Sequence, residues 1–453
     1  MKHLTPQIIA EITKGEYVGS ESGLNVRVFG ASYDSRNVKP GNLFVCVKGA
    51  RADGHAYTES AFESGAACCL AEAHIPGAKG PYVLVKSTLE AVKTIAGHYR
   101  SSFSIPIIGI TGSVGKTTAK ELTAAVLGEK FRVHKTYGNL NNELGVPLTL
   151  LSLDECHEAA VIEMGISEFG EMSRLSKMVR PDIFIITKIG YAHLKSLGDL
   201  SGVLRAKSEA FSFMKPDGIA VLNGDDELLW KYDPKIKKIT FGFDSRNDFR
   251  AENVRCSGTD FILFDIANNT DRFAAKIPAY GNHMAHLASA AAAVGQILGV
   301  TQDGIRRGLL SYAPVGGRAN VSATGFITLI DDCYNANPNS VKEALESLSS
   351  FSGRRVAILG DMLELGTRSD ELHAEIGAFA ERHNIDSLIC CGDKAKLIFD
   401  GYMASGGKTA RHFHLKDELI LDLPHLISKN DAVLVKASRG MLFEHITSVL
   451  REM

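Results

Sequence analysis

The sequence of 453 residues lacks several features that mark specialised classes of protein. Its formal net charge is −2, with 50 basic and 52 acidic side chains, so it has no overall positive field to attract nucleic acid. Its apolar runs, such as 105–110 and 288–294, are far shorter than the roughly 20 residues that a membrane helix needs. We therefore expect neither a nucleic-acid partner nor a membrane span.

Cysteine does not occur at the spacing of a metal site or a redox motif. The eight cysteines include two adjacent pairs but no Cys-x-x-Cys, and they lie in apolar surroundings. This pattern predicts buried, reduced thiols that act as small hydrophobic side chains. The first residues lack the apolar segment of a secretory signal, so we expect a cytoplasmic location.

The length predicts roughly three domains, and a composition of 45% hydrophobic and 23% charged residues is typical of globular proteins. Residues 1–104 combine short β-like runs with one helical stretch at 89–99, which predicts a small α+β domain. The serine-rich junction at 101–106 precedes a strong strand signal, so we place a domain boundary near residue 104.

Residues 105–315 alternate short apolar runs with helical segments, which predicts a mostly parallel sheet covered on both faces. After a linker-like Pro-Val-Gly-Gly-Arg segment at 314–318 the alternation restarts, so 316–453 are expected to form a Rossmann-like domain. The sequence as a whole predicts an α/β protein of three domains. The expected strands are 105–110, 159–163, 182–187 and 218–222 in the central domain, and 326–330, 355–359, 387–391 and 432–435 in the third.

The sharpest motif is a glycine-rich loop at 112–118, between a predicted strand and a predicted helix. Its main-chain N–H groups can surround phosphate oxygens, Lys116 can reach the β- and γ-phosphates, and Thr117 can bind Mg²⁺. A strict P-loop has glycine where this chain has Ile110, and a structural glycine turn is the alternative. The residues predicted to bind nucleotide phosphates are Gly112, Ser113, Val114, Gly115, Lys116, Thr117 and Thr118.

Glu163 ends the predicted strand 159–163 and would lie at the same sheet edge as the loop. A second Mg²⁺ ligand belongs at this place, although a solvated glutamate is the alternative. By pattern alone His193 is an ordinary loop histidine and Lys207 an exposed helix lysine. In the third domain, 331–338 and 360–366 are polar loops after strands, which favours ligand contacts over plain turns.

Together these segments resemble the Mur ligase family over nearly the whole chain. The third-domain motifs are similar to those members that join a D-alanyl-D-alanine dipeptide to a UDP-muramyl tripeptide. The motifs that carry the resemblance are Asp-Ser-Arg at 34–36, the glycine-rich loop, Tyr-Gly-Asn-Leu-Asn-Asn-Glu-Leu-Gly-Val-Pro-Leu at 137–148, Glu-Met-Gly at 163–165, 334–340, 360–366, and Lys-Ala-Ser-Arg at 436–439.

The resemblance implies a cytoplasmic, monomeric enzyme of peptidoglycan synthesis that uses ATP and Mg²⁺. ATP would phosphorylate the terminal carboxylate of UDP-MurNAc-tripeptide, and the amine of D-Ala-D-Ala would attack the acyl phosphate. Residues 1–104 would bind the UDP-muramyl peptide, 105–315 would bind ATP, and 316–453 would bind the dipeptide and close over ATP.

The resemblance also implies roles for individual residues. His193 and a carbamylated Lys207 would join Thr117 and Glu163 as metal ligands, and Lys116, Lys207 and His193 would be the catalytic set. The uridine nucleotide would contact Asp34, Ser35 and Arg36, and the muramyl peptide would contact Asn139, Asn141 and Asn142. ATP would contact His283, Arg318, Asp332, Asn335 and Asn337. The dipeptide would contact Lys436, Ser438 and Arg439.

Four positions depart from the family pattern at the nucleotide end, and one of them is Lys195, where the family usually has glutamate after His-Leu. Lys188 stands where the family usually has asparagine, and Met284 and Leu287 replace the asparagines of a His-Asn-x-x-Asn helix start. Loss of these amides weakens polar recognition, whereas Lys188 could contact a phosphate or occupy a metal site. These departures leave open a Mur-like protein that binds its ligands without ligating them. A folylpolyglutamate-synthase-like ligase is a further alternative, but it would not explain the first 100 residues.

Overall fold

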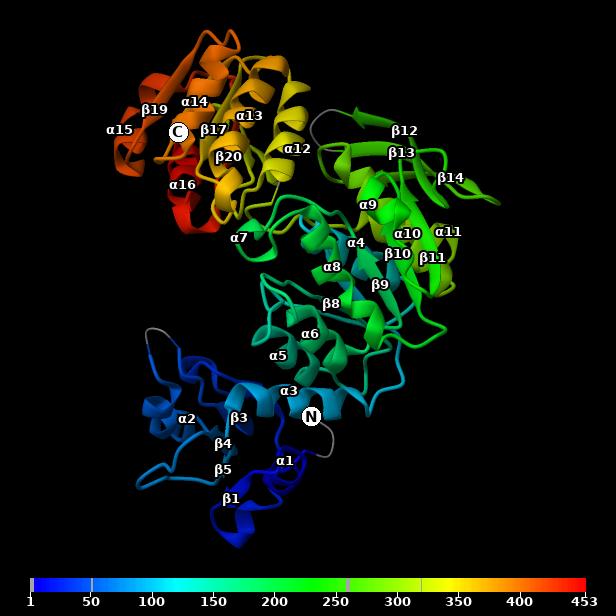
Figure 1. Ribbon diagram of the computed structural model, residues 1–453, viewed down its shortest axis with the longest axis vertical. Coiled ribbons are helices and arrows are strands. Elements are labelled where there is room, and N and C mark those ends of the chain that lie inside the picture. Colours follow the sequence, from blue (N-terminus) through cyan, green and yellow to red (C-terminus); the bar gives the residue numbers. More distant parts are fainter. Residues whose placement is uncertain (1–3, 50–51, 258–260, 319) are drawn as a thin grey trace.

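The chain folds around three β-sheets that follow one another along the sequence (Figure 1). A computed structural model describes residues 4–49, 52–257, 261–318 and 320–453. The first three residues, on which the expectation about a secretory signal partly depends, lie outside this range. We call the elements α1 to α3 the N-terminal part, β6 to α11 the central part, and β15 to α16 the C-terminal part. The predicted α/β fold class is confirmed.

The N-terminal part contains a five-stranded sheet with the order β1-β5-β4-β3-β2, in which only β1 pairs antiparallel. The predicted helix at 89–99 is confirmed as α3, but the sequence analysis missed the short helices α1 and α2. The elements are α1 Pro6–Thr13, β1 Glu16–Val18, β2 Gly30–Ser32, β3 Asn42–Val45, α2 Thr58–Glu63, β4 Cys68–Ala71, β5 Tyr82–Leu84 and α3 Thr88–Arg100.

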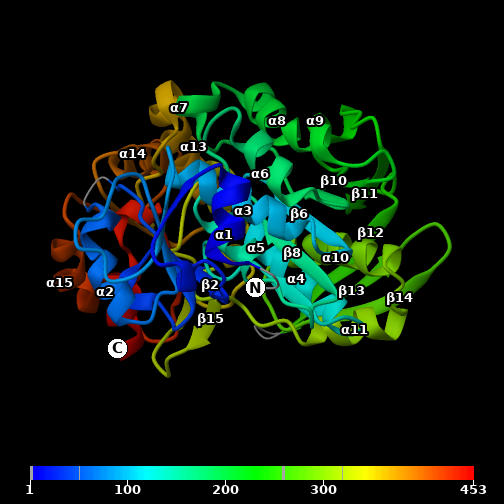
Figure 2. The same ribbon diagram turned by 90° about the horizontal axis from the view of Figure 1, so that it is seen from below.

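The central part contains a nine-stranded sheet with the order β14-β13-β12-β11-β10-β9-β6-β8-β7. All pairs from β7 to β12 are parallel, as expected, and β12, β13 and β14 add an antiparallel extension that the sequence analysis did not predict. This extension lies at the outer edge of the central part in both views (Figures 1 and 2).

The central elements run from β6 to α11. They are β6 Ile107–Thr111, α4 Lys116–Gly128, β7 Val133–Lys135, α5 Gly145–Leu151, β8 Ala159–Glu163, α6 Glu171–Val179, β9 Ile183–Ile186, α7 Leu194–Leu197, α8 Leu200–Ser208, β10 Ile219–Asn223, α9 Glu227–Lys231, β11 Lys237–Gly242, β12 Phe249–Ser257, β13 Phe261–Ala267, β14 Arg272–Ile277, α10 His283–Ile297 and α11 Gln302–Leu310.

The central strands are buried on both faces, which explains their continuous apolar sequences. Every residue of β6, β8 and β9 is buried. Ile107 packs in one hydrophobic cluster with residues of α3, α5 and α6, and Ile108 packs in another with residues of α4 and α10. Successive side chains of a strand point to opposite faces, so helices cover both sides of the sheet.

The C-terminal part contains a six-stranded sheet with the order β15-β16-β20-β17-β18-β19, in which only β15 is antiparallel. All four strands predicted for the third domain are present, with ends that shift by at most two residues. The elements are β15 Asn320–Ala323, β16 Thr328–Asp331, α12 Pro338–Ser349, β17 Arg355–Gly360, α13 Ser369–Arg382, β18 Ser387–Cys391, α14 Ala395–Ala404, β19 Ala410–Phe413, α15 Lys416–Leu426, β20 Ala432–Lys436 and α16 Glu444–Glu452.

All eight cysteines are free thiols, but Cys156 and Cys256 are exposed, so the prediction of burial is wrong for these two and correct for the other six. Among the described helices, none combines the length and the apolar character that crossing a bilayer requires.

Candidate active site

A cavity of about 970 Å³ lies between the central and C-terminal parts. It opens at the carboxyl ends of β6 and β8, and Glu163 ends β8 beside Ile110 of β6, as the sequence predicts. Parallel sheets bind their ligands at this edge. The predicted site residues that line the cavity are Ser113, Val114, Gly115, Lys116, Thr118, Asn141, Asn142, Glu163, His193, His283, Arg318, Asp332, Asn335, Asn337 and Lys436.

The glycine-rich loop connects β6 to the start of α4. Gly112 has a φ of +151°, and a Cβ atom there would lie 1.9 Å from Thr187 Oγ1, so only glycine fits. Lys116 is the first residue of α4, and its Nζ donates a hydrogen bond of 2.7 Å back to the carbonyl oxygen of Gly112. Burial lowers the pKa of Lys116 and nearby Arg318 adds to this effect, while Glu163 opposes it. The ammonium group therefore faces the loop.

The buried carboxylate of Glu163 lies beside the loop. Its Oε2 accepts a hydrogen bond of 2.8 Å from Thr117 Oγ1, and its Oε1 accepts one of 2.7 Å from Asn141 Nδ2. A carboxylate next to a hydroxyl supplies the oxygen ligands that Mg²⁺ prefers. Within the described ranges there is no group of three or more His, Cys, Asp or Glu side chains that could hold a metal ion. The Glu163 carboxylate and the Thr117 hydroxyl beside a phosphate loop fit Mg²⁺, which usually combines one or two carboxylates with phosphates and waters.

Lys207 corrects the sequence analysis. The periodicity of α8 predicts an exposed lysine, but the side chain is 2% exposed because α8 also buries Val203 and Ala206 on this side. Burial holds the pKa of Lys207 well below its usual range, and the charge of Lys116 adds to this effect. A buried lysine with a lowered pKa is a feature of functional sites rather than of helix surfaces.

His193 lies near the two lysines, just before α7, with a φ of +54°. Its Nδ1 is 2.6 Å from Glu364 Oε2 of the C-terminal part. Burial lowers the pKa of His193, and Lys116 and Lys207 add to this effect against the influence of Glu364. A neutral imidazole is the form that binds metals, so the environment suits the predicted role.

On the C-terminal side of the cavity, Arg318 lies with its guanidinium 4.0 Å from the centre of the Tyr334 ring. Within the part of the chain that the structure describes, Arg318 Nε has no hydrogen-bond partner. Because a guanidinium binds phosphate oxygens with good geometry, this unpaired donor fits a nucleotide site. Lys436 is buried, and its Nζ donates to Asp332 Oδ2 at 2.5 Å and to the Asn335 carbonyl at 3.1 Å, so it holds the 332–335 loop in place.

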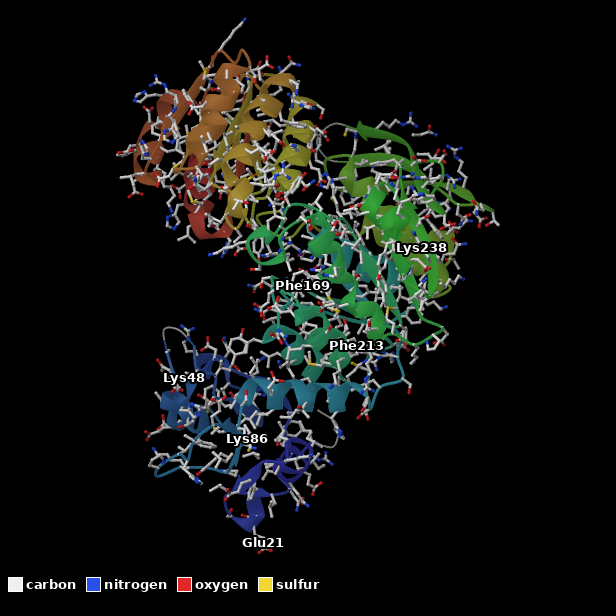
Figure 3. All side chains as sticks on the ribbon, viewed as in Figure 1. Glu21, Lys48, Lys86, Phe169, Phe213 and Lys238 are labelled. Atoms are coloured by element: carbon white, nitrogen blue, oxygen red, sulfur yellow. The ribbon has the colours of Figure 1, made fainter. Side chains whose placement is uncertain are left out.

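Several predicted residues lie outside the lining of this cavity. Asp34 caps the short 3-10 helix Ser35–Asn37 and forms an ion pair of 2.7 Å with Arg36 in the N-terminal part. That part extends away from the C-terminal part, with Glu21 at its far tip (Figure 3). The other predicted residues outside the lining are Gly112, Thr117, Asn139, Lys207, Ser438 and Arg439.

The apolar departures at the start of α10 have a structural explanation. Met284 is 3% exposed and Leu287 is 5% exposed, and both pack in the hydrophobic cluster under the sheet. Leu287 also lies against the glycine-rich loop, where a Cβ atom on Gly115 would be 3.0 Å from its Cδ1. These two side chains therefore support the loop by packing rather than by hydrogen bonds.

The sequence analysis missed His286, one turn into the same helix. Its Nε2 lies 3.1 Å from Asn223 Oδ1, and its ring packs against Phe241 and Phe243. His286, Asn223 and Phe243 all line the cavity. Only the His-x-x-His spacing at 283–286 could have drawn attention to it.

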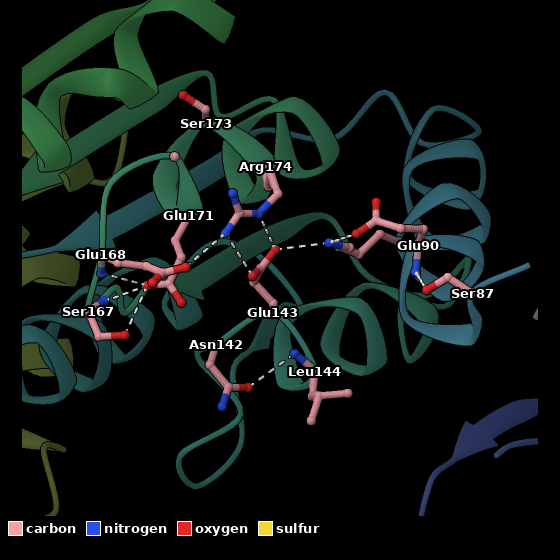
Figure 4. A network of polar contacts seen from close by, with 12 residues as sticks. Ser87, Glu90, Asn142, Glu143, Leu144, Ser167, Glu168, Glu171, Ser173 and Arg174 are labelled. Atoms are coloured by element: carbon pink, nitrogen blue, oxygen red, sulfur yellow. Dashed lines mark hydrogen bonds and ion pairs between the residues drawn. The ribbon is translucent and has the colours of Figure 1, made fainter. Parts of the chain in front are cut away.

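Glu143 belongs to the 137–148 motif, and the sequence alone predicts no role for it. Its carboxylate accepts hydrogen bonds from Arg174 at 2.6 and 3.0 Å and from Lys93 at 2.9 Å (Figure 4). It therefore ties α3 and α6 to the loop that carries Asn141 and Asn142. The side chain of Asn142 accepts from the N–H groups of Leu144 and Gly145 at the start of α5, although it was predicted to face a substrate.

Three family models match the chain in succession. "Mur ligase family, catalytic domain" matches residues 27–100, "Mur ligase middle domain" matches 110–295, and "Mur ligase, glutamate ligase domain" matches 317–439. A relative from Bacillus subtilis, named UDP-N-acetylmuramoyl-tripeptide–D-alanyl-D-alanine ligase, is 36% identical over 99% of this chain and 98% of its own length. An Escherichia coli relative of the same name is 34% identical over 100% and 99%.

Solved structures agree with the relatives. A crystal structure of MurF from Acinetobacter baumannii superposes with a TM-score of 0.90 at 29% identity and covers 99% of both chains. A structure of MurF from Thermotoga maritima in complex with ADP superposes with a TM-score of 0.84 at 30% identity and covers 94% of this chain and 97% of its own. The resemblance found in the sequence is thereby confirmed, and the chain belongs to the Mur ligase family, with MurF enzymes as its full-length relatives.

Proposed function

We propose that this chain joins D-alanyl-D-alanine to UDP-N-acetylmuramoyl-tripeptide with ATP. The γ-phosphoryl group passes from ATP to the terminal carboxylate of the tripeptide, which releases ADP. The dipeptide amine then attacks the acyl carbon, so the C–N bond forms, phosphate leaves and the amine gives up a proton. The observation that carries this proposal is the 36% identity to a ligase of this name over 99% of the chain.

The charges around the cavity suit transfer of a phosphoryl group. Lys116 and Arg318 both line the cavity and offer two cations to the phosphate oxygens. Such transfers depend mainly on positioning and on neutralising charge. Thr117 and Glu163 would hold Mg²⁺, which offsets the negative charge of the phosphates when bound. The main-chain N–H groups of the loop complete the phosphate site.

His193 and Lys207 are proposed as further metal ligands. Burial holds the pKa of Lys207 well below its usual range, and its deprotonated amine nitrogen can form a bond to the carbon of CO₂ and release a proton. The resulting carbamate is an anion, and it would replace the buried amine by a ligand suited to a metal. Full activity of a Lys207→Ala variant, without any gain from added short carboxylates, would contradict this role.

The three domains predicted from the sequence have separate roles in the proposal. Residues 1–104 bind the UDP-muramyl peptide, 105–315 bind ATP, and 316–453 bind the dipeptide. A cytoplasmic location and a monomeric state belong to the same proposal. The proposed contacts are Asp34, Ser35 and Arg36 for the uridine nucleotide, Asn139, Asn141 and Asn142 for the muramyl peptide, and Lys436, Ser438 and Arg439 for the dipeptide.

The proposal is tested by phosphate release from ATP with Mg²⁺, UDP-muramyl tripeptide and D-Ala-D-Ala. Release that requires all three substrates is expected, and substrate binding by folded protein without release would favour the binding-only alternative. Lys116→Ala should lower turnover by about 10²–10³-fold, since it removes a donor to the transferred phosphate. The exposed Lys231 on α9 offers the control Lys231→Ala, which should retain full turnover.

A further inference from the structure

An ion pair joins the two sides of the active-site cavity. Lys188 follows β9 in the central part, and Glu343 lies on α12 in the C-terminal part. Lys188 Nζ is 2.7 Å from Glu343 Oε1, and their side chains are 34% and 24% exposed. Both residues line the cavity. The ammonium group of Lys188 therefore has a partner on the opposite wall.

The main chain around Lys188 is attached to the glycine-rich loop. The N–H of Ser113 donates to the Lys188 carbonyl at 2.9 Å, and Ser113 Oγ donates to the Gly190 carbonyl at 3.0 Å. Ser113 is a residue of the predicted phosphate loop. A displacement of the main chain at Lys188 would therefore also displace this loop.

The start of α12 contacts the same segment. Asn337 Nδ2 donates to the Ser113 carbonyl at 3.3 Å, and Asn339 Oδ1 accepts from the Tyr191 N–H at 3.1 Å. These contacts are two single hydrogen bonds between polar groups. The Lys188–Glu343 pair adds opposite charges to these contacts, because Glu343 lies about one turn after Asn339 on α12.

We propose that the Lys188–Glu343 pair positions α12 and the 332–337 loop over the glycine-rich loop for phosphoryl transfer, an inference that rests on the proposed function. Lys188 then acts through Glu343 and is a positioning residue rather than a phosphate ligand. The pairing has a second consequence. A carboxylate on the cavity wall would repel phosphates, and Lys188 neutralises that of Glu343.

Charge reversal tests this pairing in the full-length protein. Lys188→Glu and Glu343→Lys should each lower kcat/KM for ATP by about 10-fold, the size of a typical coupling between contacting charges. The double variant restores the opposite charges and should recover to within about 3-fold of wild type. Thermal unfolding midpoints should stay within about 2 °C, because partly exposed pairs contribute little to stability.

A neighbouring ion pair provides a matched control. Lys342 is the residue before Glu343 on α12, and its Nζ is 3.2 Å from Glu375 Oε2 on α13. This pair has similar exposure, 31% and 42%, but lies wholly within the C-terminal part. Lys342→Glu and Glu375→Lys should leave kcat/KM for ATP unchanged.

Small-angle X-ray scattering separates this inference from the proposed function, since it needs no turnover. Each single reversal should change the scattering curve of the substrate-free protein, and the double variant should restore it. Single variants with wild-type kinetics and scattering would overturn the pairing. If Lys188→Glu and Lys188→Met lose ADP binding by calorimetry and the double variant does not recover it, Lys188 binds phosphate directly. If the single variants change the scattering curve and the double variant restores it, but wild-type protein shows no ligase turnover, the proposed function alone is contradicted.

Discussion

The joint between the N-terminal and central parts is built differently from the joint between the central and C-terminal parts. In the first joint, α3 packs against the central helices α5 and α6. Tyr99, which is 2% exposed, donates its hydroxyl to the Leu153 carbonyl at 2.7 Å. Arg100 Nε donates to the Val179 carbonyl at 3.0 Å, and its side chain is 9% exposed. The polar contacts of this joint lie within a hydrophobic environment.

The second joint combines polar contacts around a cavity with an apolar contact between the rings of Tyr280 and Phe351. Its ion pairs are Lys188–Glu343 and His193–Glu364, and the side chains of His193 and Glu364 are 33% and 61% exposed. Water can replace the partner of an exposed polar group, whereas a buried group that loses its partner bears the full desolvation penalty. The first joint is therefore expected to stay fixed during turnover. The second can open and close at low free-energy cost, which suits ligand entry.

The largest expected effect is at the first joint. Among the described residues, Glu143→Ala would leave the Lys93 ammonium, 8% exposed, with only the exposed Glu90 as a partner. The free energy of unfolding should fall by about 2–3 kcal/mol, below the roughly 3–5 kcal/mol for a fully buried pair because Glu143 is 19% exposed. Urea unfolding at pH 7 measures this change.

A surface ion pair gives the comparison for Glu143. Glu59 and Lys79 pair on the surface of the N-terminal part, with side chains 66% and 53% exposed. Glu59→Ala should lower the free energy of unfolding far less than Glu143→Ala does, because solvent screens an exposed ion pair. If both variants lose equal amounts, the first joint is not held by a buried charge cluster, and the contrast between the joints fails.

The sequence predicts those strands that are buried on both faces. The run 159–163 becomes β8 and 387–391 becomes β18 with the predicted bounds, because continuous apolar residues end at polar ones. The antiparallel extension was missed, although β14 alternates exposed and buried residues along Arg272–Ile277. Such a short alternation differs little from loop sequence without its pairing partners.

The sequence predicts those parts of the site whose residues are close to one another along the chain. The glycine-rich loop needs only a strand, a turn and a helix in order, and all three are present. Lys207 was assigned to the surface because helical periodicity cannot show which neighbouring elements cover a helix. The partners Lys188 and Glu343 are 155 residues apart, so no local pattern could connect them.

A smaller effect is expected from removing one hydroxyl group at each joint. Tyr99→Phe deprives the buried Leu153 carbonyl of its donor and should lower the free energy of unfolding by about 1–2 kcal/mol. Tyr280 donates to the Ser347 carbonyl of the C-terminal part at 2.8 Å. Tyr280→Phe should cost about half as much, because the Ser347 carbonyl also accepts from Ser350 Oγ at 2.8 Å and so keeps a donor. Thermal and urea unfolding measure the free energy of unfolding of both variants. A larger loss of this free energy in Tyr280→Phe than in Tyr99→Phe would contradict the view that the first joint is the more firmly held.

The smallest effect expected is on the pH dependence of stability. Burial raises the pKa of Glu143, but hydrogen bonds from Arg174 and Lys93 outweigh it and hold the pKa below its ordinary value of 4.5. A carboxyl group whose pKa is lowered by folding stabilises the folded state above its unfolded pKa, and this contribution is lost as the pH falls through the folded pKa. The free energy of unfolding should therefore fall less steeply below pH 4.5 in Glu143→Gln than in wild type, with parallel curves between pH 5.5 and 7. Equal slopes in acid would show that Glu143 gains nothing from its two cations, and the first joint would then resemble the second.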